Sequence, residues 1–207
     1  MSLVKYNDRS IRNLTTAPAA AASSPGALVH IKTLTASSDG TLSFVNGSDS
    51  VVLDNTYSVY KFQFINMHPA SNGVDFSVGF RDGGTDYDAV KTTTSFYAYH
   101  RENDETPALG YSTGTDLAQS TAFEQLGADT GNDNDQCHSG YMHLFNPSSD
   151  TFVKHFISVG NSTHADDYMQ NHYHAGYINT TTAIDGVQFK FSSGNIDAGD
   201  ICLYGIN

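Results

Sequence analysis

His172 and His174 are the side chains whose type and spacing most suggest a reactive site in this chain. They lie two residues apart in a segment, 169–179, whose pattern predicts a strand. Both imidazole rings should therefore project from the same face of that strand. Together with a nearby carboxylate, such a pair could bind zinc or iron. The alternative is that the two histidines form the polar face of an edge or interface strand.

The rest of a metal-binding or catalytic pattern does not accompany this pair. Cupin metal sites use such a pair on a β-sandwich, but the glutamate and distant histidine of that pattern are not evident at matching spacing. The chain also contains no G-x-S-x-G motif and no phosphate-binding glycine loop. A metal-dependent β-sandwich enzyme using His172 and His174 therefore stays an alternative. We expect a protein that is not an enzyme, with no catalytic residue, metal ligand or cofactor.

Charge is strongly negative and unevenly distributed along the chain. Asp and Glu total 22 against 10 Lys and Arg, which gives a formal net charge of −12. This charge would repel phosphates, so no nucleic-acid partner is expected. The N-terminal tail is positive instead, because it contains Lys5, Arg9 and Arg12. A basic tail on an acidic body often docks elsewhere, so these three residues are candidate anchoring residues. A solvated terminus is the alternative.

The composition divides the chain into an arm and a body. Residues 15–26 are rich in Ala, Ser and Pro, a composition that cannot bury enough surface to offset the entropy of ordering. We therefore expect an extended N-terminal arm or linker over 1–26 and one folded domain over 27–207. No segment approaches the ~20 apolar residues that a membrane-spanning helix needs, so no membrane partner is expected.

Apolar and polar residues alternate with a period of two through much of the body. This pattern predicts strands at 28–34, 41–45, 57–67, 74–80, 93–99, 139–145, 151–159 and 169–179, and two more within 183–206. Evenly spaced strands without alternating helical segments indicate two packed sheets. The expected fold is therefore all-β, an antiparallel two-sheet sandwich of the jelly-roll type.

Several local features refine this expectation. Within 183–206, the two strands should form a closing hairpin that reverses at 193–195. Apolar residues on both faces of 57–67 predict a central strand that is covered on both sides. A short helix is possible near 117–126. Cys137 and Cys202 could form one disulfide, but two buried free thiols are favoured.

Three blocks of sequence together resemble a known group of proteins. They are FRDGGTDYD at 80–88 leading into KTTTSFYAYH, FNPSSDTFVKHFIS at 145–158, and AIDGVQFKFSSGNIDAGDICLYGI at 183–206. They resemble small virion structural proteins of marine tailed bacteriophages. The resemblance transfers no site residues. It implies an accessory component of the head or tail, made in the host cytoplasm and located in the virion, with capsid or tail proteins as partners.

The residues and the resemblance together favour a non-enzymatic virion protein. Such a protein would decorate or stabilise the capsid, or attach the tail or fibre, and would dock through its N-terminal arm. Tyrosine-rich faces would pack between copies, and a trimer is the preferred arrangement. The main alternative is a carbohydrate-binding receptor adhesin of the particle. It is suggested by aromatic residues and by the long segment 101–136, and its partner would be a host surface glycan.

Overall fold

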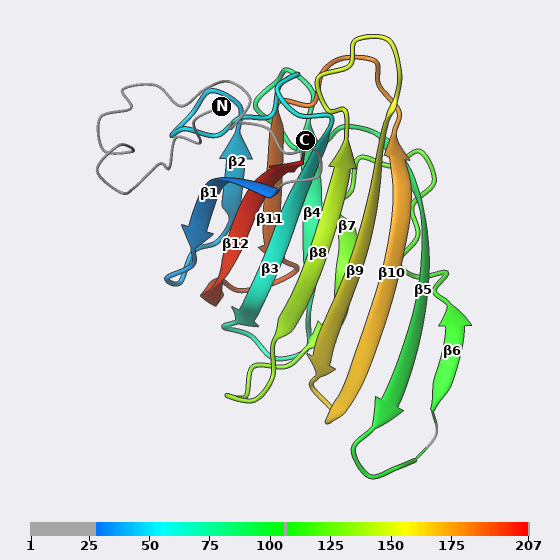
Figure 1. The fold of residues 1–207 in the computed structure, drawn as a ribbon. Coiled ribbons are helices and arrows are strands. Elements are labelled where there is room, and N and C mark those ends of the chain that lie inside the picture. The colour runs from blue at the N-terminus through cyan, green and yellow to red at the C-terminus, as the bar shows by residue number, and fades with distance from the viewer. Residues whose placement is uncertain (1–27, 106, 207) are drawn as a thin grey trace, which may run out of the picture.

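The protein is built from strands. A computed structural model describes residues 28–105 and 107–206, and within them it contains twelve strands and no helix (Figure 1). The strands are β1 (Leu28–Thr35), β2 (Leu42–Val45), β3 (Val59–Pro69), β4 (Val74–Arg81), β5 (Lys91–Arg101), β6 (Ala108–Tyr111), β7 (Glu124–Thr130), β8 (His138–Phe145), β9 (Lys154–His164), β10 (Tyr168–Ile178), β11 (Gly186–Phe191) and β12 (Ile196–Ile206).

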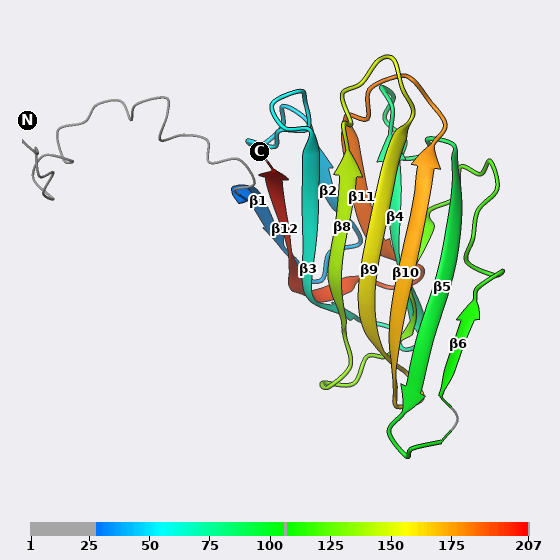
Figure 2. The same cartoon turned by 45° about the vertical axis from the view of Figure 1, so that its right-hand side comes forward.

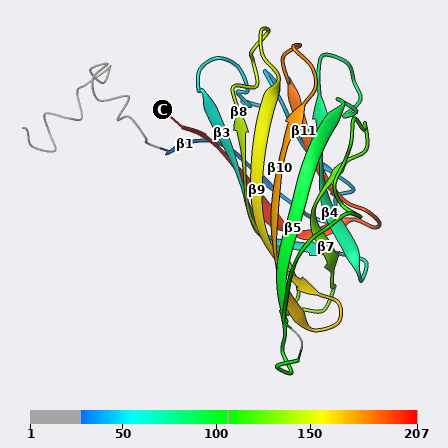
Figure 3. The ribbon, with the colours of Figure 1, turned by 90° about the vertical axis from the view of Figure 1, so that its right-hand side faces the viewer.

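The strands form two layers that pair almost entirely within themselves. The large layer has the order β6-β5-β10-β9-β8-β3-β12-β1, and the small layer has the order β7-β4-β11-β2. Every paired strand is antiparallel to its neighbours. A single pair, Thr130 of β7 with His164 of β9, joins the layers at one corner. The result is a nearly closed antiparallel sheet, with the small layer behind the large one (Figures 2 and 3).

Phenylalanines fill the space between the layers on one side of the molecule. Phe189 of β11 lies at their centre. Its ring centroid is 5.4 Å from that of Phe62 and 5.1 Å from that of Phe64, both on β3. It also stacks on Phe76 of β4 at 5.9 Å with an interplanar angle of 8°. All four side chains are at most 2% exposed, so this cluster connects the two layers through tightly packed apolar surface.

The closing segment was predicted correctly in its strands but wrongly in its pairing. Its inward and outward residues alternate as expected, and the reversal includes Gly194 at a φ of +71°. However, β11 pairs with β4 and β2, whereas β12 pairs with β1 and β3. The predicted hairpin is therefore wrong, because the reversal carries the chain from the small layer to the large one. Each strand is completed by partners from distant parts of the sequence.

Other local predictions also need correction. Strand β3 is central, but only one of its faces is covered, because Ile65 on the other face is 38% exposed. The possible helix near 117–126 is absent, and β7 begins at Glu124 instead. Cys137 and Cys202 are free thiols as favoured, although only Cys202 is buried. The candidate anchoring residues Lys5, Arg9 and Arg12, and the rest of the arm 1–26, lie outside the described residues.

Candidate functional site

One part of the interior is polar, in contrast to the phenylalanine cluster. The inner faces of β8, β9, β10 and β5 carry buried histidine, serine and threonine side chains where a core would usually be apolar. These residues are His138, Ser158, Ser162, Gln170, His172, His174, Thr93 and Ser95. Burying a polar group costs free energy unless the group is hydrogen-bonded. The hydrogen-bond partners of these side chains therefore indicate which of them are held in place and which remain free to bind a ligand.

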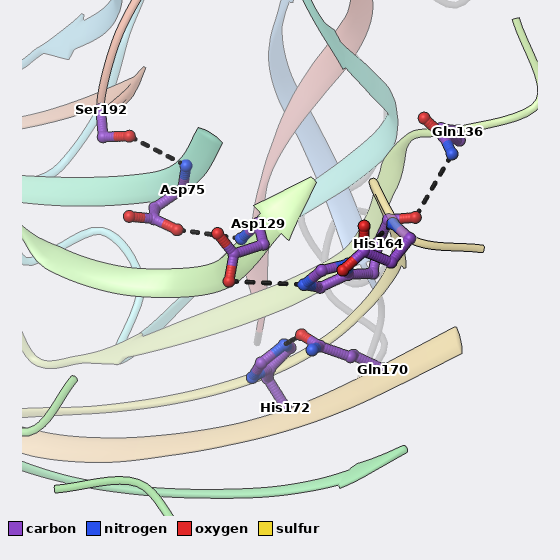
Figure 4. Close-up of polar contacts among 8 residues, drawn as sticks. Asp75, Asp129, Gln136, His164, Gln170, His172 and Ser192 are labelled. Carbon is purple, nitrogen blue, oxygen red and sulfur yellow. Dashed lines mark hydrogen bonds and ion pairs between the residues drawn. The ribbon is translucent and has the colours of Figure 1, made fainter. Parts of the chain in front are cut away.

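The structure places His172 and His174 on one face of β10, as the sequence spacing predicted, and this face is the inner one. Their rings stack with centroids 5.9 Å apart, and both side chains are almost fully buried. Nε2 of His172 lies 2.7 Å from Oε1 of Gln170 (Figure 4), and Nδ1 of His174 lies 3.1 Å from Oε1 of Glu124. The edge-strand alternative is wrong, because β10 is paired on both sides, with β9 and β5.

Burial keeps His138 and His172 in their neutral form. It lowers the pKa of His172 to about 4, with smaller contributions from His174 and His164. Burial also lowers the pKa of His138 to about 3, again with contributions from His172 and His174. The described residues contain no group of three or more His, Cys, Asp or Glu side chains arranged to hold a metal ion. His172 and His174 are therefore brought together, but without a third ligand among those residues.

Glu124 is the buried carboxylate that the sequence did not single out. Besides His174, it accepts a hydrogen bond from the hydroxyl of Thr93 at 2.8 Å. Lys91 is buried nearby and donates to the backbone carbonyls of Ala89 and Ala122. Burial lowers the pKa of this lysine to about 8, against the opposing attraction of Glu124. This carboxylate is therefore held by hydrogen bonds and an adjacent cation rather than by solvent.

Ser95 faces His174 across the β5–β10 pair, so the arrangement of Ser95, His174 and Glu124 invites comparison with a catalytic triad. In the described part of the chain, however, the Ser95 hydroxyl and Nε2 of His174 are both buried without a hydrogen-bond partner. The contact between nucleophile and base that such chemistry requires is therefore missing in this structure.

A second network closes the corner where the two layers meet (Figure 4). Nε2 of His164 lies 3.4 Å from the carboxylate of Asp129, and the backbone amide of Asp129 donates to the side chain of Asp75 at 2.9 Å. The amide of Asp75 donates in turn to the hydroxyl of Ser192 at 3.0 Å. The side-chain amide of Gln136 donates to the carbonyl of His164 at 3.3 Å. These bonds fix β7 against both β4 and β9.

A polar pocket of about 310 Å³ lies between β5, β10 and β7, next to this corner. Its lining residues come from the two layers and from the turn after β6. They are Tyr97, Tyr99, Ser112, Gly114, Thr115, Gln125, Ala128, Asp129, Tyr168, Gln170 and His172. His172, one of the two histidines that the sequence singled out, is among these lining residues.

The outer side of the large layer carries a row of large side chains that crosses five strands. We call it the aromatic face. The row follows the strand register through Tyr141, Val159, Tyr173, Phe96 and Tyr111, which are paired in that order across β8, β9, β10, β5 and β6. Phe96 and Tyr173 stack at 4.7 Å with an interplanar angle of 5°. An exposed row of this kind is typical of an interaction surface.

The aromatic face is also free of acidic strand residues, although the chain contains 22 of them. The outward positions of β8, β9, β10 and β5 hold only aromatic, aliphatic, hydroxyl, amide and histidine side chains. At its rim, the hydroxyl of Tyr111 donates to the carboxylate of Asp116 at 2.7 Å. A face whose strands carry no carboxylate, on a chain of net charge −12, can approach another acidic surface with less repulsion than the rest of the body.

A scan against protein-family models, a search of curated proteins and a search of solved structures each return no match for this chain. Within the described residues there is no helix that is long and apolar enough to cross a membrane.

Proposed function

We propose that this chain is a non-enzymatic structural protein of a phage virion, in which copies pack together through the aromatic face. The observation that carries the proposal is the row from Tyr141 to Tyr111, which crosses five strands on the outside of the large layer. Its middle member Tyr173 is 38% exposed, and Phe96 beside it is 45% exposed. The sequence blocks that resemble marine-phage virion proteins support the choice of particle.

The strand order supports a jelly roll as the basis of this protein. In that fold, two four-stranded sheets have the orders 1-8-3-6 and 2-7-4-5 when the strands are numbered along the chain. Here β1-β12-β3-β8 and β2-β11-β4-β7 follow the same scheme, if β5, β6, β9 and β10 are counted as insertions. Those insertions extend the first sheet and carry most of the aromatic face. We propose that they are the part of the chain that adapts a common virion fold to its neighbours.

Charge supports a contact between copies. Two chains with a net charge of −12 repel each other unless their contact surfaces are free of carboxylates, and the strands of the aromatic face meet this condition. We propose a trimer, in which the broad face of each copy meets both neighbours around a threefold axis. The particle partners would be capsid or tail proteins, and the arm with Lys5, Arg9 and Arg12 would bind them.

Substituting Tyr173→Glu should dissociate the assembly. The new carboxylate would lie against Phe96 in the middle of the contact, where it would be desolvated and would face the same charge on a neighbouring copy. We expect the mass in solution, measured by light scattering after size exclusion, to fall to that of one 22.3 kDa chain.

Gln188→Glu is the matched control for that substitution. It adds the same charge on the outer side of the small layer, where Gln188 bonds to Ser43. This variant should keep the assembled mass. A wild-type chain that is monomeric at high concentration, or a Tyr173→Glu chain that assembles as the wild type does, would refute the aromatic face as the contact.

Deleting residues 1–26 should separate docking from assembly. We expect the shortened chain to fold and to form trimers, because the described body supplies its own core and its own contact face. It should no longer remain with purified particles during sedimentation. A triple variant, Lys5→Ser, Arg9→Ser and Arg12→Ser, should reproduce the release without shortening the chain. Retention of both chains on particles would exclude the arm as the anchor.

A further inference from the structure

We infer that the pocket between β5, β10 and β7 is a binding site for a neutral sugar ring. The site lies between the two layers, on the inner side of β5 and β10. It is separate from the aromatic face, which lies on the outer side of the same two strands. Its volume of about 310 Å³ is at the lower end of the range for small-molecule sites, ~300–1,000 Å³. That size suits one sugar ring better than an extended chain.

His172 and Gln170 give the pocket a polar pair that matches a hydroxyl group (Figure 4). Neutral His172 donates from Nε2 to the Gln170 carbonyl at 2.7 Å, so its Nδ1 is an acceptor and the Gln170 amide group is a donor. Both side chains are more than nine-tenths buried, which holds them in place. A sugar hydroxyl both donates and accepts, so it can satisfy the two groups at once.

Two tyrosines, Tyr97 and Tyr99, give the pocket flat apolar surface beside these polar groups. Tyr97 and Tyr99 stack at 6.0 Å with an interplanar angle of 14°, and Tyr168 lies 5.3 Å from Tyr99. Tyr168 is itself held between the ring of His164, at 3.9 Å, and the guanidinium of Arg101, at 5.2 Å. The C–H face of a pyranose can pack on such rings while its hydroxyls reach the polar pair.

The charges around the pocket select against anionic ligands. Asp129 contributes a carboxylate to the wall, and neither Lys nor Arg is among the lining residues. A phosphate, a sulfate or an acidic sugar would therefore meet repulsion from Asp129, and no lining cation compensates for it, because Arg101 packs on the ring of Tyr168 instead of lining the pocket. Gln125, Ser112 and Thr115 are further lining residues with neutral hydrogen-bonding side chains. The pocket thus fits uncharged hydroxyl-rich ligands.

Sugar binding at this site does not depend on the proposed assembly through the aromatic face. The two surfaces occupy opposite faces of the same strands: His172 points inward on β10, and its neighbour Tyr173 points outward. Substitutions on one side can therefore test one role without altering the other. A failure of either proposal would leave the other standing.

The test is a titration of the full-length chain with D-glucose, D-galactose, D-mannose and N-acetyl-D-glucosamine, each monitored by ligand-observed NMR saturation transfer and by calorimetry. We expect at least one of the four to bind in the millimolar range. Two variants should weaken that binding by about tenfold or more: Tyr97→Ala removes a ring from the wall, and Ala128→Phe fills the pocket. Thermal unfolding of each variant establishes that it is folded.

Tyr173→Ala is the matched control, because it removes a tyrosine ring from the outer side of β10 beside His172. It should bind the sugar as the wild type does. Sialic acid and glucose 6-phosphate should not bind, because they are anionic. Absence of binding by all four neutral sugars would overturn the inference. Binding that persists in folded Tyr97→Ala and Ala128→Phe chains would also overturn it.

Discussion

Acidification from pH 7 to pH 4 should lower the free energy of unfolding by on the order of 5 kcal/mol, through His138 and His172. In the unfolded chain both side chains titrate near the ordinary histidine value of 6.5. In the folded chain their pKa values are about 3 and about 4. At pH values between the folded and the unfolded pKa of each histidine, the unfolded state binds more protons than the folded state. The stability that the two neutral histidines contribute is therefore fully present above pH 6.5 and is lost as the pH falls below it.

The size of this effect follows from the depth of burial. Each pKa unit corresponds to about 1.4 kcal/mol, and typical domains are stable by only about 5–15 kcal/mol. His138 has no space to move away, because its ring packs between Phe64 and Phe76. The raised pKa of Asp75 acts in the opposite direction, since burial makes the folded state take up that proton more readily. We expect the two histidines to dominate.

Denaturant unfolding at a series of pH values measures this dependence. The matched variant is His172→Gln, which keeps a polar side chain beside Gln170 but cannot take up a proton. It should reduce the slope of stability against pH by about one proton between pH 6 and pH 4.5. An unfolding free energy that is constant between pH 7 and pH 4 would show that His138 and His172 are not held neutral.

Phe189→Ala should destabilise the protein by about 3–5 kcal/mol, the largest effect expected for a single apolar substitution. The side chain is fully buried and contacts rings from both layers: Phe62 and Phe64 on β3, and Phe76 on β4. Removing it leaves a cavity between strands that have no alternative way to close, because both layers are fixed by their own hydrogen bonds. Chemical denaturation gives the change directly.

Two other substitutions calibrate that measurement. Phe189→Leu keeps most of the buried volume and should cost less than the alanine variant. Phe152→Ala truncates the same residue type where it is 70% exposed, so its effect should stay within about 0.5 kcal/mol. If Phe189→Ala and Phe152→Ala had equal effects, the phenylalanine cluster could not be the connection between the layers.

The sequence predicted the strands well but predicted their pairing poorly. Alternation identifies one buried face at a time, so it located β4 and β11 closely through Phe76, Val78, Val187 and Phe189. It carries no information about which layer a strand joins. The closing segment shows this limit, because β11 and β12 are adjacent in the chain but belong to different layers. The layer that each strand joins depends on its pairing with strands far away in the sequence. A single sequence does not reveal that pairing.

The candidate site was predicted even less completely, for a chemical reason. The spacing of His172 and His174 correctly implied a shared face, but a buried polar face and an exposed polar face have the same alternation. Glu124 lies in the segment 117–126, where the sequence allowed a short helix. The signal that could have found it is its rarity, since only three glutamates occur among 22 acidic residues. The aromatic face depends on cross-strand register and could not be read from any one strand.

Footprinting of aromatic side chains by hydroxyl radicals tests the central claim most directly, when the chain is labelled at low and at high concentration. Packing between copies through the aromatic face predicts that Phe96, Tyr111 and Tyr173 lose labelling at high concentration, while Phe152 remains labelled. Equal labelling of the first three residues at both concentrations, in a chain that sediments as a trimer, would contradict the account.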